Sequence, residues 1–189
     1  MTGELHTILW RRLDTPGHDA CRIAAVDAGW HIAGSAEFLH NGTPTHLSYS
    51  LSGDSDWRTR HGRVRGFVGS HDVDITIERA SNGSWIVDGV AVTGLEHCLH
   101  LDFGFTPATN FTQLRQLALK DGEAADLPVA WLDVPPAALQ IVDQRYERRG
   151  QSTYWYEAPR FAYAALLELT PAGVIRLYPG LWALESGQR

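Results

Sequence analysis

Cysteine is nearly absent from this sequence, and its placement excludes a cross-linked scaffold. The two cysteines, Cys21 and Cys98, lie far apart and form neither a Cys-x-x-Cys pair nor the repeated spacing of a disulfide framework. Zinc knuckles and small disulfide-stapled secreted domains both need such spacings. We therefore expect two buried free thiols in a reducing compartment.

The sequence also lacks an excess of positive charge and any long apolar run. It has 16 Lys and Arg residues against 22 Asp and Glu residues, a formal net charge of −6. This balance disfavours a nucleic-acid partner, because phosphate contacts need a basic surface. No stretch reaches the roughly 18 apolar residues of a transmembrane helix. Residues 1–12 show neither the apolar core of a signal peptide nor a lipidation motif, so we expect a cytoplasmic protein.

Motifs of catalysis and of cofactor binding are missing too. The nine histidines include no His-x-His pair and no His-Glu-x-x-His helix, so we expect no metal site. There is no Gly-x-Ser-x-Gly elbow, no phosphate-binding loop and no dinucleotide fingerprint, so we assign no cofactor and no catalytic residue. Carboxylates of separate strands can still converge in space, which leaves open a hydrolase or isomerase that uses Asp102 or Asp72.

The sequence does contain a strong period-two pattern of apolar residues. Its 189 residues, 44% of them hydrophobic, predict a single domain, residues 1–189, that buries roughly 70% of its unfolded surface. Alternation of apolar and polar residues is typical of half-buried antiparallel strands. It is clearest over 47–52, 72–78 and 99–105, and it returns over 139–146, 154–156, 161–169 and 174–178.

Turn sequences separate these segments, and helix is scarce. Pairs such as Asn41-Gly42 and Asn82-Gly83 accept positive φ, so we expect a meander of about ten or more strands. The best helix would have Asn110 as its N-cap and run to Ala118, and a second would follow Pro135-Pro136. The predicted fold class is therefore mainly β, with one or two short covering helices.

Aromatic residues point to a ligand that is partly apolar. There are seven Trp, six Tyr and six Phe residues, and amphipathic rings suit both acyl chains and sugars. Arg58 and Arg60 share one face of a predicted strand, a basic stripe that suits an anionic or sugar-bearing head group; a solvated outer face explains it as well. The residues predicted to bind a ligand are Trp30, Tyr49, Trp57, Arg58, Arg60, Trp85, Phe103, Phe105, Tyr154, Tyr156, Tyr178 and Trp182.

Three segments together resemble a known bacterial family. They are Trp10-Arg11-Arg12-Leu13-Asp14 with Cys21-Arg22, the run from Cys98 to Asn110 followed by Leu114-Arg115-Gln116-Leu117, and Tyr178-Pro179-Gly180-Leu181-Trp182. With them the chain resembles, over nearly its whole length, the glycolipid-binding family of bacteria, formerly known as a domain of unknown function.

This resemblance implies a large curved antiparallel sheet, a half-barrel or open barrel like those of bacterial lipoprotein carriers. It also implies a non-catalytic protein that binds a glycolipid or another lipidic small molecule in an apolar cavity, and we expect Arg58 and Arg60 at its mouth. Those carriers are exported, whereas this sequence shows no export signal. A protein-binding β domain, which would expose a large apolar patch, is the alternative beside the enzyme.

The C-terminal motif has two interpretations. Pro179-Gly180 predicts a sharp turn that returns Trp182 to the body of the fold. Tyr178 and Trp182 then either lock the last strand onto the core or line the cavity. We favour the structural role.

Overall fold

The computed structural model describes residues 5–134 and 137–188, which form fifteen strands and two short helices. The first eight strands are β1 (Leu5–Arg12), β2 (Gly17–Val26), β3 (Gly29–His40), β4 (Thr43–Asp54), β5 (Thr59–Val68), β6 (His71–Arg79), β7 (Trp85–Val87) and β8 (Val90–Val92). A crossover segment carries β9 (Leu101–Phe103) and the helix α1 (Asn110–Leu117). The remaining elements are β10 (Ala124–Leu132), β11 (Gln140–Arg148), β12 (Thr153–Ala158), the 3-10 helix η1 (Pro159–Phe161), β13 (Tyr163–Leu169), β14 (Ile175–Tyr178) and β15 (Trp182–Gln188).

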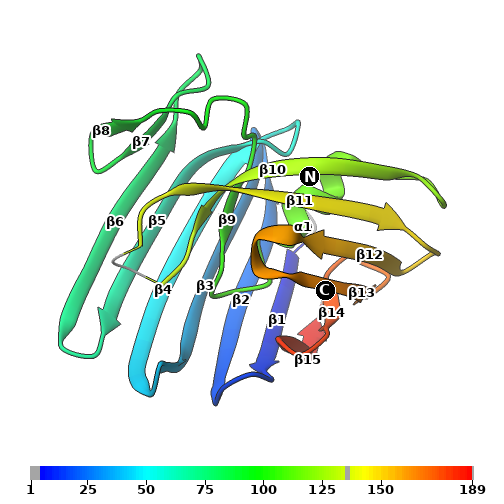
Figure 1. Cartoon of the computed structure of the whole chain (residues 1–189), viewed down its shortest axis with the longest axis horizontal. Coiled ribbons are helices and arrows are strands. Elements are labelled where there is room, and N and C mark those ends of the chain that lie inside the picture. Colours follow the sequence, from blue (N-terminus) through cyan, green and yellow to red (C-terminus); the bar gives the residue numbers. More distant parts are fainter. Residues whose placement is uncertain (1–4, 135–136, 189) are drawn as a thin grey trace.

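All fifteen strands belong to one sheet, in the order β8-β7-β6-β5-β4-β3-β2-β1-β15-β14-β13-β12-β11-β10-β9. Neighbours are antiparallel, apart from the parallel pair β9 and β10. Because β15 pairs with β1, the first and last strands of the described chain are neighbours inside the sheet. The two halves of the chain extend from them in opposite directions (Figure 1).

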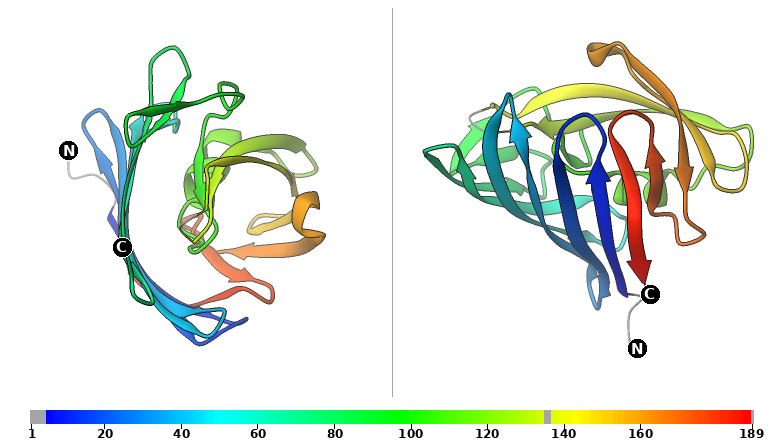
Figure 2. Two further views of the ribbon diagram at one scale, coloured as in Figure 1. Left: turned by 60° about the vertical axis from the view of Figure 1, so that its left-hand side comes forward. Right: turned by 90° about the horizontal axis from the view of Figure 1, so that it is seen from below.

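The sheet is strongly curved and remains open. Figure 2 shows its two halves bending toward one another, with α1 between them. The edge strands β8 and β9 do not pair with each other. Register shifts between β1 and β15, β4 and β5, and β13 and β14 mark irregularities of the β-bulge type, which bend strands. The prediction of a mainly β protein with a large curved open sheet and one or two short helices is confirmed.

Alternation along the strands directs one face of the sheet into the core. In β4, Thr45, Leu47, Tyr49 and Leu51 are buried, whereas the residues between them are more exposed. Burying one side chain such as Leu47 stabilises the fold by roughly 1.5–3 kcal/mol. The predicted turn between β3 and β4 is present, because Asn41 and Gly42 have φ angles of 51° and 78°, as a two-residue hairpin needs.

Two glycines let other groups approach the concave face of the sheet closely. A Cβ atom at Gly62 of β5 would lie 2.3 Å from the Leu101 side chain of β9, and one at Gly34 of β3 would lie 2.4 Å from the Tyr49 hydroxyl. Any larger residue would force these groups apart. The crossover segment can therefore pack directly on the sheet.

Two local predictions were wrong. Residues 99–105 form a strand only over Leu101–Phe103, and all three of these residues are buried. Leu101 packs on β5 and Asp102 contacts Thr109 just before α1, so both faces of β9 are covered and no half-buried strand forms. Asn110 does not cap α1: Thr109 is the N-cap, and the Asn110 side chain bonds to Tyr146 instead.

The helix predicted from residue 110 is otherwise present as α1. The second predicted helix would begin after Pro135-Pro136, and these two residues lie outside the described part of the chain. Residues 137–139 are irregular, and β11 begins at Gln140.

Candidate functional site

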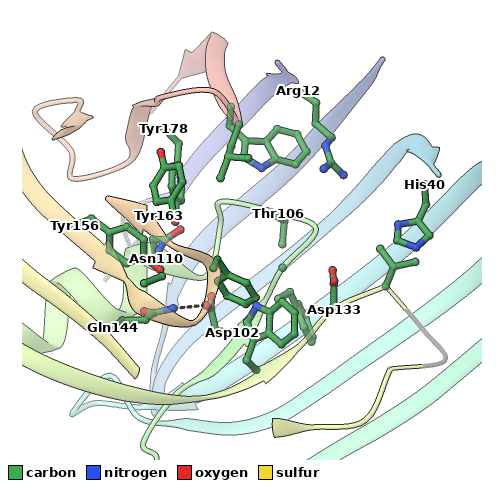
Figure 3. Close-up of a pocket in the computed structure, with 18 residues that line it drawn as sticks. Arg12, His40, Asp102, Thr106, Asn110, Asp133, Gln144, Tyr156, Tyr163 and Tyr178 are labelled. Atoms are coloured by element: carbon green, nitrogen blue, oxygen red, sulfur yellow. Dashed lines mark hydrogen bonds between the residues drawn. The ribbon is translucent and has the colours of Figure 1, made fainter. Parts of the chain in front are cut away.

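A cavity of about 460 Å³ lies between β1, the crossover segment and the second half of the chain. We call it the inner cavity, and its volume is typical of small-molecule sites. It is open to solvent, because its lining residues Gly104 and Phe161 are exposed. The lining consists of Arg12, His40, Asp102, Phe103, Gly104, Thr106, Asn110, Trp131, Asp133, Val134, Gln144, Tyr156, Ala158, Phe161, Tyr163, Tyr178, Leu181 and Trp182 (Figure 3).

A buried carboxyl group, that of Asp102 in β9, forms the polar floor of the inner cavity. Its Oδ2 atom accepts a hydrogen bond of 2.7 Å from Nε2 of Gln144, and its Oδ1 atom accepts one from the Thr109 hydroxyl. Burial raises the pKa of Asp102, and the hydrogen bonds offset this only in part. Asp102 therefore stays protonated to a higher pH than an exposed aspartate does.

A second buried polar group supports this floor. The Tyr146 hydroxyl donates to Oε1 of Gln113 at 2.6 Å and accepts from Nδ2 of Asn110 at 2.8 Å. All three side chains are buried, and hydrogen bonds in such a setting fix side-chain rotamers. The amide of Asn110 is thus held in place where it reaches the inner cavity.

Three tyrosines, Tyr156, Tyr163 and Tyr178, stand together on one side of the inner cavity (Figure 3), with ring centroids 5.5 to 6.2 Å apart. The Tyr163 hydroxyl donates to the Pro179 carbonyl at 2.6 Å, and burial raises its pKa to about 12. Burial also raises the pKa of Tyr156 and Tyr178. The tyrosines therefore remain neutral and offer ring faces to a ligand.

The lining also contains Arg12, which is paired with an acid, and Asp133, which has no partner within the described residues. Arg12 forms an ion pair of 2.7 Å with Asp14, and its guanidinium lies 5.1 Å from the centre of the Trp182 ring. Asp133 follows β10 and makes no hydrogen bond or ion pair within the described residues. Figure 3 shows it near His40, across the inner cavity from the tyrosines.

A further buried acid is bonded to the loop between β9 and α1, which we call the floor loop. Asp19 in β2 accepts hydrogen bonds from the Tyr49 hydroxyl at 2.9 and 3.0 Å and from the Thr106 hydroxyl. Burial raises the pKa of Asp19 to about 7 against the opposing effect of these bonds. Because Thr106 also lines the inner cavity, this cluster ties the floor loop to the sheet.

The structure brings four of the predicted binding residues to the inner cavity: Phe103, Tyr156, Tyr178 and Trp182. Two others pack beside Phe103, with ring centroids 6.0 Å away for Tyr49 and 5.0 Å away for Phe105. Tyr154 lines a separate hollow beside Arg148.

The remaining predicted residues lie toward the opposite end of the strands: Trp30, Trp57, Arg58, Arg60 and Trp85. Trp30 begins β3, whereas His40 of the inner cavity ends it. Arg60 bonds to Asp54 at 2.7 Å, and Arg58 lies 3.6 Å from Asp56. The structure thus places both arginines away from the inner cavity, beside acids that balance their charge.

Of the acids considered for catalysis, only Asp102 lines the inner cavity. Asp72 is exposed on β6. Sequence reasoning missed Arg12, Trp131, Asp133 and Gln144, which come from β1, the end of β10 and β11. No local pattern marks the last three, whereas Arg12 belongs to the first of the family motifs.

Across residues 5–134 and 137–188 no group of three or more His, Cys, Asp or Glu side chains is arranged to hold a metal ion. Neither helix in this part of the chain has the length and apolar character needed to cross a membrane.

The fold is thus a curved open β sheet with an aromatic-lined cavity and a polar floor, and cavities of this size are typical of proteins that bind small molecules. The family model described as "Putative glycolipid-binding" matches residues 7–183. The chain therefore belongs to this glycolipid-binding family.

A solved structure supports the same assignment. The crystal structure of a DUF1089 family protein from Pseudomonas aeruginosa superimposes with a TM-score of 0.77 and 25% sequence identity, over 87% of this chain and 91% of that one. No curated protein matches the chain.

Proposed function

We propose that the protein binds a glycolipid without catalysis and holds the sugar head group in the inner cavity. The observation that carries this proposal is the lining, where the rings of Trp131 and Tyr156 stand beside the polar groups of Asp102 and Gln144. A sugar presents apolar C–H faces and hydroxyl groups, so rings combined with hydrogen-bonding groups suit it. The family description supports a lipidic ligand.

The polar lining decides which part of the lipid enters. An acyl chain laid over Asp133, which has no hydrogen-bond partner within the described residues, would remove its carboxylate from water without supplying a hydrogen bond, which costs free energy. The hydroxyl groups of a sugar supply such hydrogen bonds. The acyl chains then leave past apolar lining residues such as Val134, Phe161 and Leu181.

Native mass spectrometry of the protein purified from its own host, followed by lipid extraction, tests the proposal. We expect a bound glycolipid on the wild type and its loss in Gly104→Leu, because even a Cβ atom there would lie 2.8 Å from the Trp131 ring. Gly187→Leu is the matched control, since a Cβ atom at Gly187 meets Leu184 at an ordinary 3.6 Å.

Absence of any bound lipid, together with no binding of added glycolipids, would overturn the function. If Gly104→Leu carries as much lipid as the wild type and Gly187→Leu do, the lipid lies elsewhere on the protein.

A further inference from the structure

We infer that the inner cavity selects an uncharged, hydroxyl-rich head group and rejects head groups that carry phosphate, sulfate or carboxylate. This inference rests on the proposed function and narrows it to one chemical class of ligand.

The charges around the inner cavity are unfavourable for an anion. Its lining holds one arginine, Arg12, and two aspartates, Asp102 and Asp133. Arg12 is engaged by Asp14 outside the lining, and only 13% of its side chain is exposed. A ligand anion would have to compete with Asp14 for that guanidinium while approaching Asp133.

Asp133 supplies hydrogen-bond acceptors that a sugar can use. It has no partner within the described chain, and a Cβ atom at Gly104 would lie 2.9 Å from its Oδ1 atom. The absence of a side chain at Gly104 therefore lets this carboxylate stand at the lining. A carboxylate accepts hydrogen bonds but donates none. The hydroxyl groups of a sugar ring can therefore donate to it, whereas the charged oxygen of an anionic head group is repelled.

Two other lining groups bear on this balance. Asp102 accepts hydrogen bonds at both oxygens and contributes no positive charge in either protonation state. His40 also lines the cavity, with its Nε2 atom 3.3 Å from the Asn41 amide nitrogen. Arg58 and Arg60, the basic pair marked by the sequence, lie toward the other end of the strands beside Asp54 and Asp56.

A matched pair of probes tests the inference. An alkyl glucoside and the alkyl glucuronide of the same chain length differ only at C6, where a CH2OH group replaces a carboxylate; the galactose pair repeats the comparison. Calorimetric titration below the critical micelle concentration should show the neutral member binding at least about tenfold more tightly, because like charges brought together at a partly dry site repel.

Asp133→Asn should reduce the ratio of the affinity for the neutral glycoside to that for the uronide to less than about threefold at low salt, because it removes the repelling charge and keeps the shape of the side chain. Asp72→Asn is the matched control: it changes net charge equally on exposed β6 and should leave the ratio unchanged. In the wild type, raising the salt concentration from about 20 mM to about 500 mM should also narrow the ratio, because salt screens charge repulsion.

Equal or tighter binding of the uronides by the wild type would overturn the inference and leave the proposed function standing. Failure of all four probes to bind would overturn the proposed function and the inference with it. If Asp133→Asn melts at the wild-type temperature yet keeps the full ratio, the assignment of selectivity to Asp133 is wrong.

Discussion

At the residue scale, the distinctive feature is a pair of buried acids that stand in no ion pair within the described chain. Asp19 and Asp102 are 0% and 6% exposed, and each accepts hydrogen bonds from neutral side chains. Burial without a cation disfavours the charged form. Burial therefore raises the pKa of both acids.

Because of Asp19, we expect the protein to become less stable as the pH rises. Its pKa in the folded protein is about 7, against 3.8 for an ordinary aspartate, so the unfolded chain releases the proton first. Folding stability should therefore fall as the pH rises from about 4 to about 7 and level off above that. A difference of about three pKa units corresponds to at most about 4 kcal/mol.

Asp19→Asn should remove this loss and be more stable than the wild type at pH 8, while the two differ little at pH 4. Urea unfolding at both pH values measures this, with Asp72→Asn as the exposed control. If the wild type is as stable as Asp19→Asn at pH 8, the prediction is wrong.

At the scale of elements, the turn between β14 and β15 shows how one motif serves the fold and the cavity together. Leu181 donates its backbone N–H to the Tyr178 carbonyl at 2.9 Å, and Leu13 donates to the Leu181 carbonyl at 2.8 Å. Trp182 is 3% exposed and lines the inner cavity. Trp182 is therefore both packed into the core and part of the cavity lining, two roles that the sequence presented as alternatives.

Trp182→Ala should cost about 3 to 5 kcal/mol of stability, as is typical when a buried aromatic side chain is deleted. Trp155→Ala is the matched control, because Trp155 is only partly buried on β12 and its indole bonds to Glu157. Thermal melts and glycolipid titrations on both variants separate the roles. An unchanged melting temperature with lost binding would contradict the structural role.

At the scale of the whole molecule, one open sheet has two very different edges. The edge strand β8 is mostly exposed, whereas β9, the other edge, is wholly buried. Unpaired strand edges normally exchange their amide hydrogens quickly, but burial prevents access.

Hydrogen exchange should therefore be fast in β8, slow in the central strands β3 and β4, and slow again in β9. Mass spectrometry of peptides covering 85–92, 43–54 and 99–105 measures it. Exchange in β9 as fast as in β8 would show that the crossover segment does not stay packed in the concave face.

Local chemistry alone predicted much of this protein. The alternation of 47–52 and 72–78 and turns such as Asn41-Gly42 predict strands and hairpins, because side chains of a strand alternate between two faces and because few residues accept positive φ. Those signals established the mainly β class, and the motifs at both ends and at the centre established the family resemblance.

Only the tertiary structure decided which residues share a cavity. Asp133 and Gln144 reach Asp102 and Arg12 because the sheet curves until β1, β9, β10 and β11 surround one space, and no local pattern records that curvature. The same packing buries both faces of β9 and leaves Arg58 toward the far end of the strands. Strand identity depends on neighbours in sequence, whereas the site depends on neighbours in space, which long-range packing alone supplies.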